Sequence, residues 1–419
     1  MFEVCLFDLD QTLVETDDMK VLRESGKNRL DEAYAAQVVT AFKAKSRKDR
    51  TIYSEKLLLR IREKFPDLKL GVFTRSPRGY ADAILKTAYP AIKWDVIIAY
   101  EDVKHTKPYG DGIDKAMFSF GYKYISKVVL IGDSDADIRS AYNAGCVIVL
   151  DKTSWPDKYT NDNWSSLGHI PDVLIDDPEQ IIDVLSDYRP YLPELERLLS
   201  NSEKRAGTSR FDRVNKFIPK AVGGDKTAFP IFSCGRSFSG YKSLEWRKKW
   251  HELTESIHAQ KDADLFPDEW VTSVRTFISR TFPLLVFGGE LIVTVIPHRP
   301  GRKPRLEAFL EQLEATYKNN PKTIKGKLSF VPDLLAYRDG VRSNSNDKLN
   351  ANERFENIRD HLFVQRLEIL NGSTKVLVID DVSTTGSTLI YAKKYLSNAG
   401  ASEITCLSIA MNISNVLYE

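Results

Sequence analysis

The segment Phe7-Asp8-Leu9-Asp10-Gln11-Thr12-Leu13 closes an apolar run, residues 2–7, that has the length and composition of a buried β-strand. Asp8 and Asp10 stand two positions apart, so their side chains point to the same side of an extended backbone. Two carboxylates placed in this way can share one divalent cation while one of them attacks a phosphorus atom. The segment therefore predicts a phosphate-handling site at the end of a strand.

Further short apolar runs follow through the first two hundred residues and alternate with amphipathic segments, at 68–73, 96–99, 128–131 and 147–150. Such alternation predicts an α/β fold with a mostly parallel sheet. Residues 14–67, between the first two runs, include stretches with helical spacing. They are long enough for a small helical cap and no more.

Three later segments strengthen the phosphate prediction because they carry suitable groups in a consistent order. Thr74 ends the second apolar run with a hydroxyl, and Lys107 offers a cation before a helical segment. Asp133 and Asp137 come directly after the run at 128–131. The carboxyl ends of parallel strands meet at one edge of a sheet, where α/β proteins hold their ligands. We therefore expect these groups to lie around Asp8.

With these four motifs, the chain resembles the haloacid dehalogenase (HAD) phosphatase superfamily over about residues 1–200. The resemblance implies a Rossmannoid domain in which Asp8 is the nucleophile that forms an aspartyl phosphate and Asp10 is the acid/base. Thr74 and Lys107 would hold the phosphoryl group. The resemblance also implies a Mg²⁺ cofactor, held by Asp8, the Asp10 carbonyl and Asp133, with Asp137 in support. Gln11 stands where many members have glycine.

A second motif lies near the other end of the chain, where the aliphatic run 376–379 is followed by Asp380 and Asp381. Adjacent carboxylates suit a ribose diol. The hydroxyl-rich stretch 383–388 opens a helix, and backbone NH groups at a helix start can cradle a phosphate. A 5-phosphoribosyl group requires both features together.

This run closely resembles the phosphoribosyl pyrophosphate (PRPP) motif of type I phosphoribosyltransferases, and the resemblance extends over about residues 225–415. It implies a second α/β domain whose PRPP-binding residues are Asp380, Asp381, Ser383, Thr384, Thr385, Gly386, Ser387 and Thr388. The basic, proline-rich turn at 297–305 would be the pyrophosphate loop, with Arg299 and Arg302. The polar segment 334–364 suits a lid, and its spacing is similar to the ComF branch. Because 6-oxopurine transferases usually have an acid at the position of Thr384, hypoxanthine and guanine are less expected acceptors.

The length of 419 residues predicts two to three domains. We expect a phosphatase domain at 1–199, a linker at 200–212 and a phosphoribosyltransferase-like domain at 213–419. Sixty basic residues balance 58 acidic ones, so overall charge favours neither nucleic acid nor a membrane as partner. The four scattered cysteines and the lack of an apolar leader predict a cytoplasmic protein.

These features predict a bifunctional enzyme that combines a Mg²⁺-dependent phosphatase with PRPP-dependent transfer and acts on ribose phosphates or nucleotides. The expected partners are phosphate esters, PRPP and pyrophosphate, with self-association left open. Two alternatives remain. The second domain could sense PRPP or a nucleotide and regulate the phosphatase. Alternatively, the small cap could leave the phosphatase open to a nucleic-acid end, with the second domain as an accessory binding domain.

Overall fold

The computed structural model describes residues 1–156, 161–203, 209–261, 263–319, 326–343, 347, 349–414 and 416–417, without the side chains of 161–164. By contacts, the chain forms two compact units. The first comprises Met1–Leu192, Phe238–His251 and Ser414–Glu419, and the second comprises Pro193–Ser237 and Glu252–Ile413. The boundaries at 199 and 213 therefore stay a prediction, and residues 204–208 of the expected linker lie outside the described residues.

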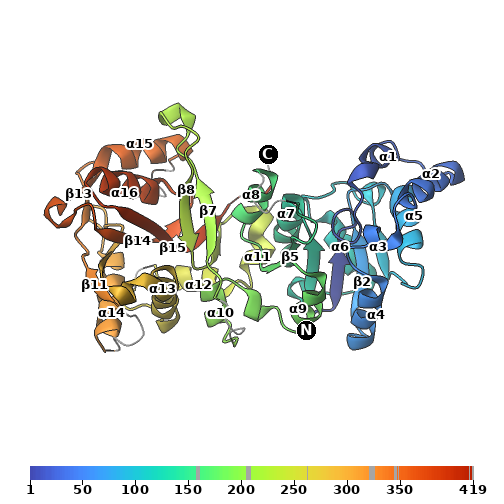
Figure 1. Cartoon of the computed structure of the whole chain (residues 1–419), viewed down its shortest axis with the longest axis horizontal. Coiled ribbons are helices and arrows are strands. Elements are labelled where there is room, and N and C mark those ends of the chain that lie inside the picture. The colour runs from blue at the N-terminus through green and yellow to red at the C-terminus, as the bar shows by residue number, and fades with distance from the viewer. Residues whose placement is uncertain are drawn as a thin grey trace. The chain divides into compact units, whose positions relative to one another are not determined.

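The first unit is built on a parallel sheet of six strands in the order β3-β2-β1-β4-β5-β6. Figure 1 labels β2 and β5 of this sheet. Its strands are β1 (Val4–Phe7), β2 (Lys69–Phe73), β3 (Val96–Ile98), β4 (Val128–Gly132), β5 (Val147–Asp151) and β6 (Val173–Ile175). All residues of β1, β4 and β5 are buried, which explains why these strands are continuous apolar runs rather than alternating ones. The α/β fold predicted from the sequence is confirmed.

The predicted cap region between β1 and β2 is helical. It contains α1 (Lys20–Glu24), α2 (Glu32–Phe42), α3 (Arg47–Arg50) and α4 (Glu55–Lys64). Asp31, Ser46 and Ser54 each accept a hydrogen bond from a backbone NH in the first turn of the helix that follows, so local sequence defines where α2, α3 and α4 begin. The remaining helices around the sheet are α5 (Arg78–Ala88), α6 (Asp111–Phe120), α7 (Asp135–Ala144), α8 (Asn161–Gly168) and α9 (Ile181–Ser186).

A segment distant in sequence, Phe238–His251, completes the first unit. This segment contains α11 (Glu245–Lys248), and the next helix, α12 (Glu252–Ala259), belongs to the second unit. Helix α7 ends at Gly145, whose φ of +94° favours glycine, and a Cβ there would stand 2.6 Å from the Cβ of Trp246. This close approach positions α11 against the end of α7.

Arg247 of α11 is buried within the first unit. It donates a hydrogen bond to the Cys146 carbonyl at 2.9 Å and forms an ion pair with buried Asp172, and its guanidinium lies 4.0 Å from the centre of the Trp250 ring. A buried guanidinium is stable only with its carboxylate partner, and the buried carboxylate likewise requires the guanidinium. The segment is therefore part of the core of the first unit.

The second unit contains a sheet in the order β11-β10-β14-β15-β8-β7, with β9 also paired to β15. The strands are β7 (Asp212–Lys216), β8 (Phe229–Ser233), β9 (Arg236–Phe238), β10 (Glu290–Val295), β11 (Lys327–Phe330), β14 (Lys375–Ser383) and β15 (Glu403–Ile413). Along the path from β11 to β8 the neighbours are parallel, and β7 is antiparallel to β8.

The helices of the second unit are α10 (Glu194–Leu199), α12, α13 (Asp268–Thr281), α14 (Arg305–Asn319), α15 (Ala351–His361) and α16 (Ser387–Asn398). The segment expected to be a lid contains the antiparallel pair β12 (Leu335–Tyr337) and β13 (Leu362–Val364), with α15 between them. Residues 344–346 and 348 of that segment lie outside the described residues. Among the described helices, none is long and apolar enough to span a membrane.

Candidate functional sites

The first candidate site lies at the carboxyl edge of the sheet in the first unit. Asp8, Thr74 and Asp133 are the residues that directly follow β1, β2 and β4, three neighbouring parallel strands. Lys107 comes from the loop after β3 and is 4% exposed. Its ammonium lies 2.7 Å from a carboxylate oxygen of Asp8 and 2.6 Å from one of Asp137. The structure therefore brings together the groups that the sequence motifs predict.

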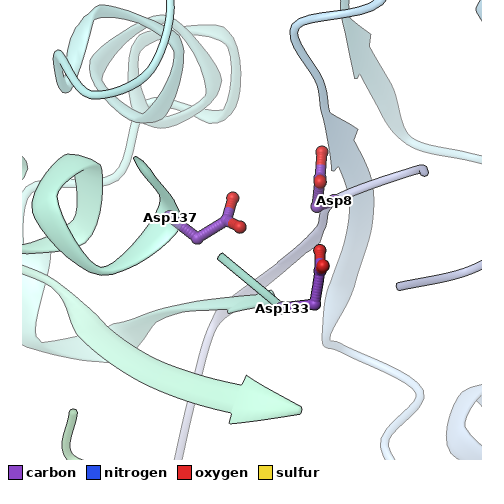
Figure 2. A group of neighbouring side chains, drawn as sticks. All are labelled: Asp8, Asp133 and Asp137. Atoms are coloured by element: carbon purple, nitrogen blue, oxygen red, sulfur yellow. The ribbon is translucent and has the colours of Figure 1, made fainter. Parts of the chain in front are cut away.

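Three carboxylates surround one space in this site, as Figure 2 shows for Asp8, Asp133 and Asp137. Each offers an oxygen that lies within 4.8 Å of the other two. Asp137 stands in the first turn of α7, where its carboxylate accepts hydrogen bonds from the backbone NH of Ser134 at 3.1 Å and from its hydroxyl at 2.5 Å. The start of the helix thus orients the third carboxylate.

The electrostatics of these groups fit a divalent cation. Burial raises the pKa of Asp8 to about 7, although the nearby Lys107 ammonium opposes this shift. Burial, followed by the negative charges of Asp137 and Asp8, raises the pKa of Asp133 well above its usual range. A hard cation with oxygen ligands, such as Mg²⁺, would offset this crowding of negative charge. The residues present are therefore suited to hold Mg²⁺.

Asp10 is held by four donors that the sequence motifs did not identify. Its carboxylate accepts hydrogen bonds from Thr16 at 2.6 Å, from Tyr80 at 3.1 Å and from Ser76, and an Arg23 nitrogen lies 3.1 Å away. These contacts orient the side chain expected to act as acid/base. No spacing rule links them to Asp10, since they come from the cap and from the β2–α5 region.

Gln11 adopts a φ of +63°, in the left-handed region that favours glycine. This conformation explains why the position that follows the second aspartate is commonly glycine in the family that the motif resembles. The turn is retained in this chain with a side chain present. The backbone of Gln11 is therefore fixed by the surrounding structure, here by a hydrogen bond from its NH to the Val14 carbonyl at 2.7 Å.

The second candidate site lies at the end of β14 in the second unit. Asp380 and Asp381 were expected to follow the strand, but β14 continues to Ser383 because its pairing with β15 persists, with Asp380 opposite Ser408 and Ser383 opposite Met411. Gly386 then precedes α16 with a φ of +77°, and a Cβ there would stand 2.8 Å from Ile231. Only glycine fits this turn without displacing a core side chain.

The electrostatics of the second site combine two carboxylates with several cations. Burial, followed by the negative charge of Asp381, raises the pKa of Asp380 well above its usual range. Asp381 forms an ion pair with Arg305 of the basic turn. The site is a cavity of about 790 Å³ lined by the residues predicted to bind PRPP, namely Asp380, Asp381, Ser383, Thr384, Thr385, Gly386, Ser387, Thr388, Arg299 and Arg302. The individual roles of these residues stay predictions.

Further residues at the second cavity come from distant segments. Tyr337, Ser343 and Arg354 of the expected lid line it, and so does Lys261. Lys216 of β7 donates a hydrogen bond to the Thr384 carbonyl at 3.1 Å, and burial lowers the pKa of its ammonium. Sequence reasoning missed Lys216 and Lys261, since neither is near a motif.

Comparisons with known families match a different family model to each half of the chain. The model of haloacid dehalogenase-like hydrolases matches residues 19–150, and the model of the phosphoribosyl transferase domain matches residues 332–416. Neither distinguishes the ComF branch, which stays a prediction. A similar curated protein is the pyrophosphatase PpaX of Oceanobacillus iheyensis, 24% identical over 215 residues, with 43% of this chain and 96% of that protein covered. The pyrophosphatase PpaX of Bacillus cereus is 26% identical over 125 residues, with 28% of this chain and 52% of that protein covered.

Solved structures with similarity to the chain include a predicted phosphoglycolate phosphatase from Haemophilus somnus, with 20% identity, a TM-score of 0.32, and coverage of 44% of this chain and 97% of that one. Another is a β-phosphoglucomutase from Clostridium difficile, with 16% identity, a TM-score of 0.34, and coverage of 46% and 99%. The two family matches and the two sites lead to one conclusion: the protein is an enzyme that carries a haloacid dehalogenase-like hydrolase domain and, toward its C-terminus, a phosphoribosyl transferase domain.

Proposed function

We propose that the first unit is a Mg²⁺-dependent phosphatase that works through an aspartyl phosphate, and that the second unit transfers a phosphoribosyl group from PRPP. The observation that carries the first part is the cluster of Asp8, Asp133 and Asp137 around one space, with the Lys107 ammonium beside it. The second part rests on the acidic pair and phosphate loop that line one cavity.

In the first unit, a carboxylate oxygen of Asp8 attacks the phosphorus atom, and the bond from phosphorus to the leaving oxygen breaks. Asp10 gives a proton to that oxygen. Water then attacks the aspartyl phosphate, orthophosphate leaves, Asp8 is regenerated, and Asp10 accepts the proton. Lys107 and Thr74 hold the other phosphoryl oxygens during both steps. Mg²⁺, when held by Asp8, Asp133, Asp137 and the Asp10 carbonyl, supplies positive charge that reduces the repulsion between Asp8 and the phosphate.

In the second unit, Asp380 and Asp381 bind the ribose hydroxyls, and the loop 383–388 binds the 5'-phosphate with backbone NH groups at the start of α16. Arg299 and Arg302 bind the pyrophosphate. The acceptor attacks the anomeric carbon of the ribose, the bond from that carbon to the pyrophosphate oxygen breaks, and pyrophosphate leaves. Ribose phosphates or nucleotides are then the expected metabolites of the protein.

A second candidate function is that the second unit senses PRPP without turnover. The ion pair of Arg305 with Asp381 does not separate the two functions, because both require Asp381 to bind the ribose. Exchange of labelled pyrophosphate into PRPP in the presence of candidate acceptors and their nucleotides separates the two functions. Exchange supports transfer, whereas PRPP binding without exchange across an acceptor panel supports sensing.

Removal of the divalent cation is expected to abolish hydrolysis, because the crowded carboxylates then repel a phosphate dianion. Phosphate release from a simple aryl phosphate should fall to background with a chelator and return with Mg²⁺. Zn²⁺ alone should not restore it, since zinc prefers nitrogen and sulfur ligands. Circular dichroism before and after chelation serves as the control for folding. Full activity in the chelated protein would contradict the metal assignment.

Replacing both members of the acidic pair, Asp380→Ala with Asp381→Ala, is expected to weaken PRPP binding by about a hundredfold, from about 1.5 kcal/mol for each lost hydrogen bond to a charged group. Titration calorimetry measures the affinity. Hydrolysis of an aryl phosphate by the same variant is the control, because the first unit is unchanged. Equal affinity in the variant and the parent protein would refute the ribose role.

A further inference from the structure

The cavity of the first unit extends from the catalytic carboxylates to the cap. It has a volume of about 720 Å³, within the range of pockets that hold ligands much larger than orthophosphate. Asp8, Asp133 and Lys107 line its inner end. Its outer part is lined by Lys20, Arg23 and Lys27, which follow one another at intervals of three and four residues in and after α1, and by Arg75 after β2.

The cations of the outer part differ in their partners. Arg23 is paired with Asp10 at 3.1 Å, so its charge is already neutralised. Lys20, Lys27 and Arg75 are exposed, and none of the three has a carboxylate within ion-pair distance in the part of the chain that the structure describes. The Lys27 ammonium instead lies 4.4 Å from the centre of the Tyr100 ring.

Two carboxylates, Asp17 and Glu24, also line this part of the cavity. The outer part of the cavity thus has three cations without carboxylate partners and two carboxylates. Its net charge is one positive charge, and these groups are separate from Asp8, the residue proposed to attack phosphorus. A substrate with a single phosphoryl group, bound at Asp8, leaves these cations unused. A substrate with a second phosphoryl group would pair with them, and Lys and Arg are the side chains that bind phosphate oxygens best.

We propose that Lys20, Lys27 and Arg75 form a second phosphoryl-binding subsite and that the first unit hydrolyses compounds with two phosphoryl groups in preference to monophosphates. The inference rests on the proposed phosphatase function of this unit. One phosphoryl group lies at Asp8 and is transferred, while the other stays on the leaving group and binds the subsite. The three cations are specificity-determining residues, since they contact the part of the substrate that does not react.

Two classes of substrate carry two phosphoryl groups and could bind in this way. In inorganic pyrophosphate the leaving group is phosphate itself, so hydrolysis consumes one water and yields two orthophosphates. The PpaX relatives and the pyrophosphate released by phosphoribosyl transfer favour this source. In a sugar bisphosphate the leaving group is the sugar monophosphate, and the two phosphoryl groups stand farther apart. The reaction then yields one orthophosphate and the sugar monophosphate.

The test compares selectivity between substrates in the full chain with Mg²⁺. Orthophosphate release is measured for pyrophosphate, ribose 1,5-bisphosphate, ribose 5-phosphate and an aryl monophosphate. The test variant combines Lys20→Gln, Lys27→Gln and Arg75→Gln. A matched control combines Lys48→Gln, Lys56→Gln and Lys86→Gln, which remove the same charge from exposed side chains of the same unit that do not line the cavity.

In the parent protein, kcat/KM for pyrophosphate or for the bisphosphate is expected to exceed that for both monophosphates. The ratio of kcat/KM for the substrate with two phosphoryl groups to kcat/KM for a monophosphate should fall by about tenfold in the test variant. The fall should come mainly from a higher KM for the substrate with two phosphoryl groups. In the control variant this ratio should fall by less than about twofold. Whichever of pyrophosphate and the bisphosphate has the higher kcat/KM relative to the monophosphates is the class of substrate that the subsite binds. A parent protein that prefers monophosphates, or a ratio that is equal in the test and control variants, would overturn the subsite. Absence of Asp8-dependent hydrolysis of every substrate would instead reject the proposed phosphatase function.

Discussion

Asp8→Asn is expected to reduce phosphate release from an aryl phosphate by at least about a thousandfold. The amide is nearly the same size as the carboxylate but cannot attack phosphorus to form an aspartyl phosphate. It also removes a ligand charge from the cluster with Asp133 and Asp137. The loss should appear in kcat, measured with Mg²⁺ in excess.

Two comparisons make this result specific to the nucleophile. Asp67→Asn removes an exposed carboxylate elsewhere on the same unit and should leave hydrolysis unchanged within about twofold, as surface substitutions usually do. Calorimetry should give the same PRPP affinity for Asp8→Asn as for the parent protein. If Asp8→Asn retained a substantial fraction of the parent rate, another group would have to be the nucleophile.

Arg247→Ala is expected to lower the free energy of unfolding of the first unit by about 3 to 5 kcal/mol, the usual cost of removing one partner of a buried ion pair. The change removes the Arg247 guanidinium from the buried carboxylate of Asp172 and from the Cys146 carbonyl. Denaturant unfolding, followed by the fluorescence of the tryptophans, measures the difference.

Lys249→Ala provides a matched control two residues away, because the contacts of this exposed lysine are a surface ion pair with Glu245 and a cation–π contact with the exposed Trp246 ring. It should cost less than about 1 kcal/mol. A double variant, Arg247→Met with Asp172→Asn, should recover part of the stability, since neither of these two side chains is then charged. Equal stability of Arg247→Ala and the parent protein would show that the segment 238–251 is not part of the core.

The sequence predicts which groups lie together in the first candidate site because parallel strands bring their carboxyl ends to one edge. Once the apolar runs are assigned to β1, β2 and β4, the positions of Asp8, Thr74 and Asp133 follow from the topology of the sheet. The loop at 383–388 before α16 is predicted for a similar local reason, since its glycine and hydroxyl groups are contiguous in sequence. In both cases, neighbouring residues along the chain or along the sheet carry the signal.

The sequence does not predict the contacts that depend on how distant elements pack. Arg23 and Tyr80 reach Asp10 from the cap and from α5, and neither belongs to a motif. Arg247 meets Asp172 across 75 positions. The extension of β14 through Asp380 and Asp381 depends on pairing with β15, which the expected end of the aliphatic run at Ile379 did not indicate.

The return of Phe238–His251 to the first unit has a consequence for synthesis of the protein. The N-terminal residues leave the ribosome first, but Arg247, which pairs with the buried Asp172, emerges only after residues 1–237. Domains at the N-terminus usually fold first during translation. In this chain, the first unit cannot complete its packing until residues 238–251 have been made, and these follow the first part of the second unit. A fragment that ends before residue 238 would lack this part of the core and would remain incompletely packed.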